Sequence, residues 1–264
     1  MIFSALMYHS IYRNDEELND LPEEDRPYAI SLDNFQQQLN SLVKNNIAVL
    51  DPEIFNDTPV DCIKGNSVLL TFDDGHVSFY RYAYPELVKR NMSGIFFVTS
   101  ELIKERKDFC SWCQLKEMSD NGMSIQSHGK THKFISDLNP EEAHDELLNS
   151  KLTIESELTS TVNLISFPGG RYLKREIENG LNIGYEYFFT SNEGLNLFND
   201  CAKNHVVKRL AMRCTTSLDE FLKLSKGSFV VIKKRIAIYI VKYAIKKIIG
   251  NSVYHFIYKR RRLN

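Results

Sequence analysis

Two adjacent carboxylates, Asp73 and Asp74, follow a short apolar run at residues 68–72 and precede a glycine. An apolar run of this length is typical of a buried strand, so both carboxylates are expected at the rim of a core, facing water, a cation or a substrate. Because neighbouring side chains on a strand point in different directions, one aspartate could hold a metal while the other takes a proton. An ordinary strand-to-loop turn is the alternative, since Asp-Gly is a common turn dipeptide.

Two imidazoles, His128 and His132, lie four residues apart further along the chain. On one helical turn or in a tight loop they would face the same way. Alone they could be surface histidines. With a carboxylate from another strand end, they make a set of one Asp and two His that is typical of a catalytic divalent metal with open coordination positions. Zinc suits these ligands, and cobalt, nickel or iron would also fit.

Taken together, three motifs resemble the polysaccharide deacetylase family (NodB-homology, carbohydrate esterase family 4), over roughly residues 2–215. They are Thr71-Phe72-Asp73-Asp74-Gly75, Ser127-His128-Gly129-Lys130-Thr131-His132 and Phe167-Pro168-Gly169-Gly170. The resemblance implies an α/β fold, a deformed (β/α)7 barrel, that removes acetyl groups from N-acetylated sugars with a divalent metal: Zn2+, or alternatively Co2+ or Ni2+. It implies that Asp74, His128 and His132 bind the metal and that Asp73 is the general base.

The chain departs from the family pattern at two positions. Gly129 replaces the Ser or Thr that usually follows the first metal histidine, so one polar contact is expected to be lost. Ser166 stands where an arginine usually orients the catalytic base. Arg171 or Arg209 could replace that arginine, and each could instead be a surface or structural residue.

The general acid of the family, a histidine in a late Leu-x-x-His motif, is not evident near residues 200–215, and His205 lacks the pattern. Leu6-Met7-Tyr8-His9 matches it at the opposite end of the chain. This arrangement resembles the circularly permuted branch of the family found among exopolysaccharide deacetylases. We therefore expect His9 to protonate the leaving amine, the alternative being a satisfied histidine at a strand end.

Substrate contacts are expected from the loop that follows Phe167. A backbone N–H of Pro168-Gly169-Gly170 could stabilise the oxyanion together with the metal, and Arg171 lies beside it. Sugar rings could stack on aromatic side chains, although core or rim packing is the commoner fate of each. The candidates are Phe79, Tyr80, Trp112 and Tyr172.

The order of elements indicates how these residues come together. Strands are predicted at 2–8, 47–50, 68–72, 94–98, 123–126, 164–167, 187–190 and 206–210, and helices at 31–45, 78–90, 112–121, 139–160, 173–182 and 217–225. Alternating strands and helices favour parallel βα units, whose sites lie at the carboxyl ends of the strands. The acidic segment 13–28 is predicted as a loop leaving that rim, a candidate lid, and residues 51–66 as a second loop.

The charge of the chain is divided unevenly. Residues 221–264 hold twelve Lys and Arg and no acid, while the first 220 residues hold 21 basic and 34 acidic residues. We expect a catalytic barrel at 1–226 and a basic amphipathic helix at 227–264. On that helix Arg235, Lys242 and Lys246 share a face, which predicts peripheral contact with anionic lipid. The alternative is a helix packed on the barrel. No nucleic-acid-binding module accompanies the charge.

Neither a secretory signal nor an apolar run long enough to span a bilayer is visible, so the sequence predicts a cytoplasmic protein, peripheral at the inner membrane face. Five cysteines do not form a disulfide framework, and the CxxC spacing of Cys110 and Cys113 is interpreted as coincidence. We expect a hydrolase acting on a polysaccharide or its lipid- or nucleotide-linked precursor. The alternatives are a catalytically silent barrel that binds glycan or a partner, and a C–N hydrolase for a non-sugar amide.

Overall fold

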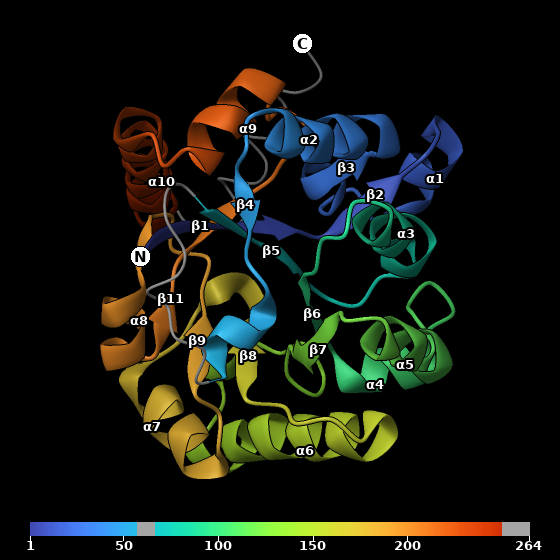
Figure 1. Cartoon of the computed structure of the whole chain (residues 1–264). Coiled ribbons are helices and arrows are strands. Elements are labelled where there is room, and N and C mark those ends of the chain that lie inside the picture. The colour runs from blue at the N-terminus through green and yellow to red at the C-terminus, as the bar shows by residue number, and fades with distance from the viewer. Residues whose placement is uncertain (57–66, 250–264) are drawn as a thin grey trace.

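The computed structural model describes residues 1–56 and 67–249, without the side chains of residues 104, 239 and 241–249. A largely parallel sheet occupies the centre and helices surround it (Figure 1). Its strands are β1 (Ile2–Tyr8), β4 (Ala48–Val49), β5 (Ser67–Phe72), β6 (Ile95–Val98), β7 (Ser124–Ser127), β8 (Leu164–Ser166), β9 (Tyr187–Phe189), β10 (Asn196–Leu197), β11 (Val206–Val207) and β12 (Arg209–Ala211).

The sheet curls into a nearly closed barrel. Its strand order runs β1-β5-β6-β7-β8-β9-β11, and β12, one residue beyond β11, pairs in parallel with β1. The register aligns Leu6 with both Leu70 of β5 and Leu210 of β12. Counting β11 and β12 as one strand position, the described part of the chain has seven parallel strand positions around the barrel. This confirms the predicted (β/α)7-like fold.

Alternation along β5 sends its side chains to two different layers. Val68, Leu70 and Phe72 join the large core between sheet and helices, whereas Leu69 joins a second core with Phe97. Because side chains alternate along a strand, Thr71 and Asp73 lie on the Leu69 face, inside the barrel. Asp74 turns the other way, towards the rim.

The helices are α1 (Asp15–Asp20), α2 (Leu32–Lys44), α3 (Tyr84–Val88), α4 (Ser100–Glu105), α5 (Trp112–Asp120), α6 (Pro140–Leu158), α7 (Lys174–Ile183), α8 (Phe198–Asn204), α9 (Leu218–Ser225) and α10 (Phe229–Ile249). Several begin at the caps that their sequences indicate. Ser31 caps α2, and the Asn139 side chain accepts the Glu142 N–H in a capping box at the start of α6.

Some predicted boundaries were wrong. The expected loop at 13–28 contains α1, because the Asn14 side chain accepts the Glu17 N–H and caps a helix with an acidic first turn. The segment also connects β2 (Ser10–Tyr12) to β3 (Ala29–Ser31), which pair in parallel as a small separate sheet. The helix expected at 78–90 opens with a π-helical turn at residues 79–83, and the strand at 206–210 is divided at Lys208. Helices α4 and α8 were not predicted, and residues 57–66 of the second predicted loop lie outside the described residues.

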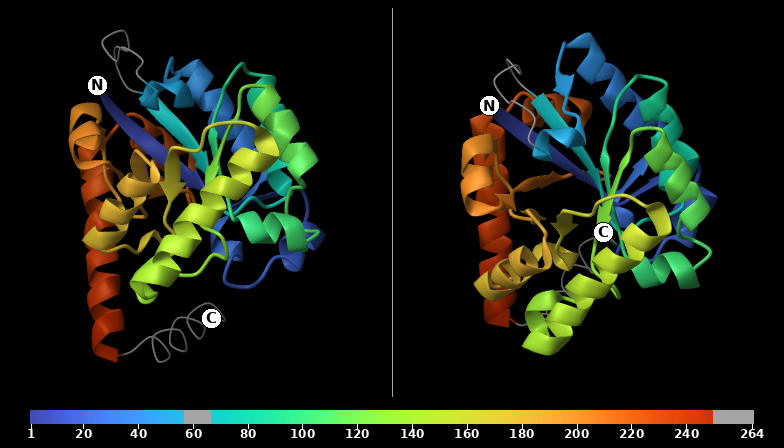
Figure 2. Two further views of the ribbon diagram at one scale, coloured as in Figure 1. Left: turned by 90° about the horizontal axis from the view of Figure 1, so that it is seen from below. Right: turned by 60° about the horizontal axis from the view of Figure 1, so that its bottom comes forward.

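The C-terminal helix α10 begins against the barrel, and Figure 2 shows it along one side of the molecule. Ile232 is 3% exposed and belongs to the main core. Arg235 faces inward: it forms an ion pair with Glu193 at 2.7 Å and donates to the carbonyl of Ala211. Arg235 is therefore not part of a free basic face, contrary to expectation. The side chains of Lys242 and Lys246, and all of residues 250–264, lie outside the described residues.

Within residues 1–56 and 67–249, no helix is both long and apolar enough to cross a membrane. The CxxC pair forms no disulfide, since Cys110 is a free buried thiol and Cys113 a free exposed one.

Candidate active site

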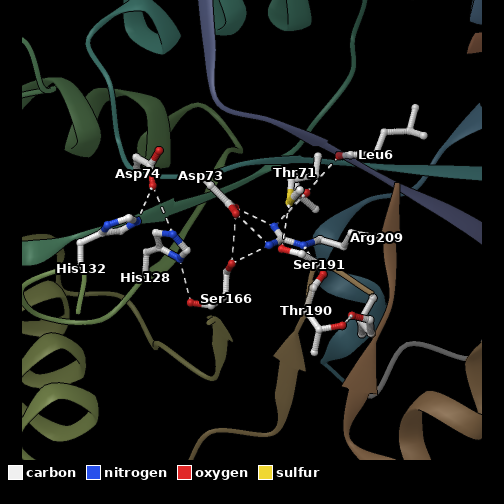
Figure 3. Close-up of polar contacts among 12 residues, drawn as sticks. Leu6, Thr71, Asp73, Asp74, His128, His132, Ser166, Thr190, Ser191 and Arg209 are labelled. Atoms are coloured by element: carbon white, nitrogen blue, oxygen red, sulfur yellow. Dashed lines mark hydrogen bonds and ion pairs between the residues drawn. The ribbon is translucent and has the colours of Figure 1, made fainter. Parts of the chain in front are cut away.

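Three side chains from two strand ends converge at the rim of the barrel. The Oδ1 atom of Asp74 lies 3.2 Å from Nε2 of His128 and 3.1 Å from Nε2 of His132, as Figure 3 shows. One ligand atom from each residue lies within 4.8 Å of the others. Both Asp74 and His132 have left-handed backbones, with φ of 80° and 66°, so the turns after β5 and β7 aim these groups at one point.

The hydrogen bonding of this cluster fits a cation. The Nδ1 of His128 lies 2.7 Å from the carbonyl of Ser166, a pure acceptor, so Nδ1 carries the proton and Nε2 presents a lone pair. That lone pair faces Asp74 Oδ1, which is buried and has no hydrogen-bond partner among the described residues. A carboxylate oxygen and imidazole nitrogens facing one another are stabilised by a positive ion between them, and this donor set suits zinc, cobalt or nickel.

Asp73 lies inside the barrel and is paired with a fully buried arginine. Arg209 Nη1 donates to Asp73 Oδ1 at 2.6 Å and Nη2 donates to Oδ2 at 2.8 Å. Nη2 also donates to Ser166 Oγ at 2.7 Å, and that hydroxyl donates to Asp73 Oδ2 at 3.2 Å. The Nε–H of Arg209 goes to the carbonyl of Thr190. Burial raises the pKa of Asp73, but the charge of Arg209 outweighs burial and holds this pKa below its ordinary value. Asp73 is therefore an anion with a fixed orientation.

Arg209 takes the place that sequence reasoning left open between two arginines. Arg209 reaches Asp73 from β12. The family pattern instead has its arginine at the position of Ser166, and here the Ser166 hydroxyl accepts from Arg209 in the same network. Arg171 does not reach Asp73. Its guanidinium pairs with exposed Asp137 at 2.8 Å and lies over the Phe134 ring.

His9 follows β1 beside the two carboxylates. The register places Tyr8 opposite Phe72, and the Asp73 N–H donates to the Tyr8 carbonyl, so His9 lies next to Asp73 across the sheet. Its Nδ1 is buried without a hydrogen-bond partner in the described part of the chain, and its ring packs 5.0 Å from that of Tyr28.

A cavity of about 450 Å³ reaches the site at His9 and Asp74. It is lined by His9 and Asp74 together with side chains from α1 and the segments after it, from the turn at 76–82 and from residues 106–109. Sequence reasoning missed Asp25, Tyr82 and Phe109 as lining residues, because nothing in their local pattern indicates a site. The segment 13–28 does border the cavity, as its predicted position at the rim suggested.

The loop at 168–170 supplies fewer donors than expected. Pro168 has no N–H, and the Gly170 N–H donates to the Phe167 carbonyl in a turn. A Cβ on Gly170 would lie 2.4 Å from the Ser191 backbone nitrogen, and one on Gly169 would lie 2.5 Å from the Phe134 ring, so close packing requires both glycines. In this described loop, the N–H groups of Gly169 and Arg171 remain as candidate donors to an oxyanion.

The four aromatic candidates are occupied by packing. Phe79 is fully buried in the core, and Tyr172 stacks on Phe167 with ring centroids 5.3 Å apart. Tyr80 donates to Glu117, and Trp112 packs against the main core. The aromatics that line the cavity are instead Tyr82 and Phe109.

Comparison with known proteins agrees with this geometry. Residues 61–188 match the polysaccharide deacetylase family model. Over 127 residues the chain is 32% identical to the protein named "Putative polysaccharide deacetylase YxkH" of Bacillus subtilis (strain 168), covering 48% of this chain and 45% of that protein. The chain therefore spans less than half the length of this curated relative.

Two solved structures share the fold. The Streptococcus pyogenes deacetylase PplD in complex with acetate is 25% identical, with a TM-score of 0.74 over 85% of this chain and 98% of that one. IcaB from Ammonifex degensii is 24% identical, with a TM-score of 0.71 over 85% of this chain and 97% of that one. By the match at residues 61–188, the chain contains a domain of the polysaccharide deacetylase family.

Proposed function

We propose that this protein is a metal-dependent hydrolase that removes N-acetyl groups from amino sugars of a polysaccharide or of its lipid- or nucleotide-linked precursor. The observation that carries the proposal is the division of labour between adjacent carboxylates. Asp74 lies with His128 and His132 in a set that fits a divalent cation, while Asp73 is held beside it as an oriented anion. Amide hydrolysis by activated water needs both functions.

The cation, Zn2+ or alternatively Co2+ or Ni2+, would be held by Asp74, His128 and His132, and when bound it polarises a carbonyl and makes water acidic enough to attack near neutral pH. Asp73 accepts the proton of the attacking water. Arg209 and Ser166 keep its carboxylate ionised and fixed. The N–H groups of Gly169 and Arg171 are candidate donors to the developing oxyanion.

His9 gives the proton to the leaving amine. It faces the same cavity as Asp74, and its placement at the end of β1 puts it across the sheet from the base. An acid and a base from neighbouring strand ends can then act on the two sides of one amide carbon. The Leu6-Met7-Tyr8-His9 motif supports this role, because it resembles the acid-bearing motif of the circularly permuted exopolysaccharide deacetylases.

One solved structure with the same fold supports deacetylation as the reaction. PplD is a deacetylase with acetate bound in its structure, and acetate is the product that this reaction would release. The cytoplasmic location and the peripheral membrane contact through α10 stay predictions of the sequence, and the inward position of Arg235 lends the membrane contact no support.

Acetate release from a panel of N-acetylhexosamine polymers, oligomers and nucleotide-linked sugars tests the proposal. The purified protein is stripped of metal and reloaded with zinc, cobalt or nickel, beside Asp73→Asn and the matched surface variant Asp137→Asn. We expect metal-dependent release that Asp73→Asn lowers by about 10²- to 10⁴-fold and that Asp137→Asn retains.

Other outcomes separate the alternatives. Tight metal binding without release from any sugar, but with cleavage of simple acetamides, would indicate a hydrolase for non-sugar amides. Metal binding with no hydrolysis of either class would indicate a silent binding barrel and would contradict the proposal.

A further inference from the structure

The segment that carries both metal-ligand histidines is an irregular turn. His128 follows β7, Gly129 has φ of 80° and His132 has φ of 66°. A non-glycine residue in the left-handed region costs free energy, so neighbouring contacts must hold the turn in this shape. Unless the turn keeps this shape, the His132 Nε2 cannot stay 3.1 Å from Asp74 Oδ1.

One buried carboxylate from α6 makes these contacts. Glu146 is 4% exposed, and its Oε2 accepts the N–H groups of Lys130 and Thr131, each at 2.9 Å. Its Oε1 accepts the hydroxyl of Thr131. All three donors lie between the two histidines in sequence. The carboxylate therefore fixes the part of the backbone that sets the distance from one imidazole to the other.

A second group on the same face of α6 anchors the start of the turn. Ser150, four residues after Glu146, donates to the Gly129 carbonyl at 3.0 Å and lies 2.8 Å from Ser127 Oγ. A Cβ on Gly129 would lie 3.4 Å from Glu146 Oε2. Glu146 thus lies directly against the position where the family pattern has a Ser or Thr side chain.

We infer that Glu146 is a positioning residue of the metal site, acting on His132 through the backbone of residues 130 and 131. Groups that orient metal ligands typically change metal affinity by about 10- to 100-fold when they are removed. The inference rests on the proposed function only in that this site takes a divalent cation. It requires no particular sugar substrate.

The test is Co2+ titration of the metal-free protein, followed by the visible absorption of bound cobalt. Glu146→Ala should weaken binding about 10- to 100-fold and change the spectrum. Glu146→Gln should bind within about threefold of wild type, because its amide oxygen can accept both N–H groups and its NH2 can donate to the Thr131 hydroxyl. Rescue by glutamine would show that geometry, not charge, carries the effect.

Glu155→Ala is the matched control. Glu155 lies on the same helix, accepts the Val162 N–H at 3.0 Å and pairs with Lys151, away from the metal cluster. The Glu155→Ala variant should have a lower free energy of unfolding but the same Co2+ affinity as the wild type. If Glu146→Ala does not fold, Thr131→Val, which replaces the hydroxyl with a methyl group of similar size, should weaken Co2+ binding severalfold, whereas exposed Thr161→Val should not.

Equal Co2+ affinities for Glu146→Ala and Glu155→Ala, or equal losses for the alanine and glutamine variants at residue 146, would overturn the inference. A wild-type protein that binds Co2+ but releases no acetate would overturn the proposed function and leave the role of Glu146 standing. A wild-type protein that binds no Co2+ would overturn both.

Discussion

The adjacent carboxylates Asp73 and Asp74 lie in two regions with opposite electrostatics. Inside the barrel, Asp73 is matched by the buried guanidinium of Arg209, and its negative charge is balanced by the protein itself. At the rim, Asp74 shares one oxygen with two imidazole nitrogens and has no matching positive charge of its own. The interior charges are thus matched within the folded chain, whereas on the proposed function the rim cluster would be completed by a cation. Fold stability and metal affinity should therefore respond to different substitutions.

The largest expected effect is on the interior pair. Arg209→Met would leave the Asp73 charge buried and unpaired, which costs about 3–5 kcal/mol of unfolding free energy. Urea unfolding of the metal-free protein measures this loss, and deacetylation should disappear with it. The double variant Arg209→Met with Asp73→Asn should regain more than about 1 kcal/mol, because it removes both charges together. Arg171→Met, which removes an exposed arginine, is the control. If Arg209→Met were as stable as this control, the buried pair would not stabilise the fold.

Next in size is an effect on turnover alone. His9→Ala removes the proposed acid but none of the three proposed ligands, so kcat should fall by about 10²- to 10⁴-fold while Co2+ affinity stays the same. His144→Ala is the control, because His144 is exposed on α6 and bonds to Asn179. Turnover at the wild-type rate, or loss of cobalt, would remove His9 from the acid role.

Lowering the pH should weaken Co2+ binding at the rim and the stability contributed by the interior pair in two different pH ranges. Burial lowers the pKa of His132, but the contact with the Asp74 carboxylate outweighs burial and raises this pKa above its ordinary value. Protons therefore compete for this imidazole, and Co2+ affinity should fall as pH drops through the raised pKa. The lowered pKa of Asp73 means that the unfolded state binds a proton first. Its contribution to unfolding free energy is complete above about pH 4 and is lost as pH falls further.

Cobalt titrations and urea curves across pH check both statements, with Arg209→Met/Asp73→Asn as the variant that lacks the interior pair. Its stability should depend less on pH below about 4 than that of the wild type. If wild-type stability and cobalt affinity were lost together, the two regions would not be independent.

The rim residues could be predicted from the sequence because the members of each motif are close together along the chain. Asp73 and Asp74 end an apolar run, and His128 and His132 share one turn, so residue type and spacing, together with the family resemblance, make them candidates. The partner of Asp73 is 136 residues away, on β12, and no local pattern links the two. Only the parallel pairing of β12 with β1, and of β1 with β5, brings Arg209 to Asp73. The same limit hid Glu146, which looks like any acidic residue of an amphipathic helix until its face is known.

The smallest expected effect concerns Arg171, which the sequence placed near the substrate. Its guanidinium is 54% exposed and pairs with a half-exposed aspartate, and such surface pairs contribute about 0–1 kcal/mol. Arg171→Ala should therefore change unfolding free energy by less than about 1 kcal/mol and kcat/KM by less than about threefold, because its backbone N–H is retained. A tenfold loss in kcat/KM with unchanged stability would instead mean that the side chain leaves Asp137 to bind the glycan. The rim would then include a substrate contact that the interior network does not need.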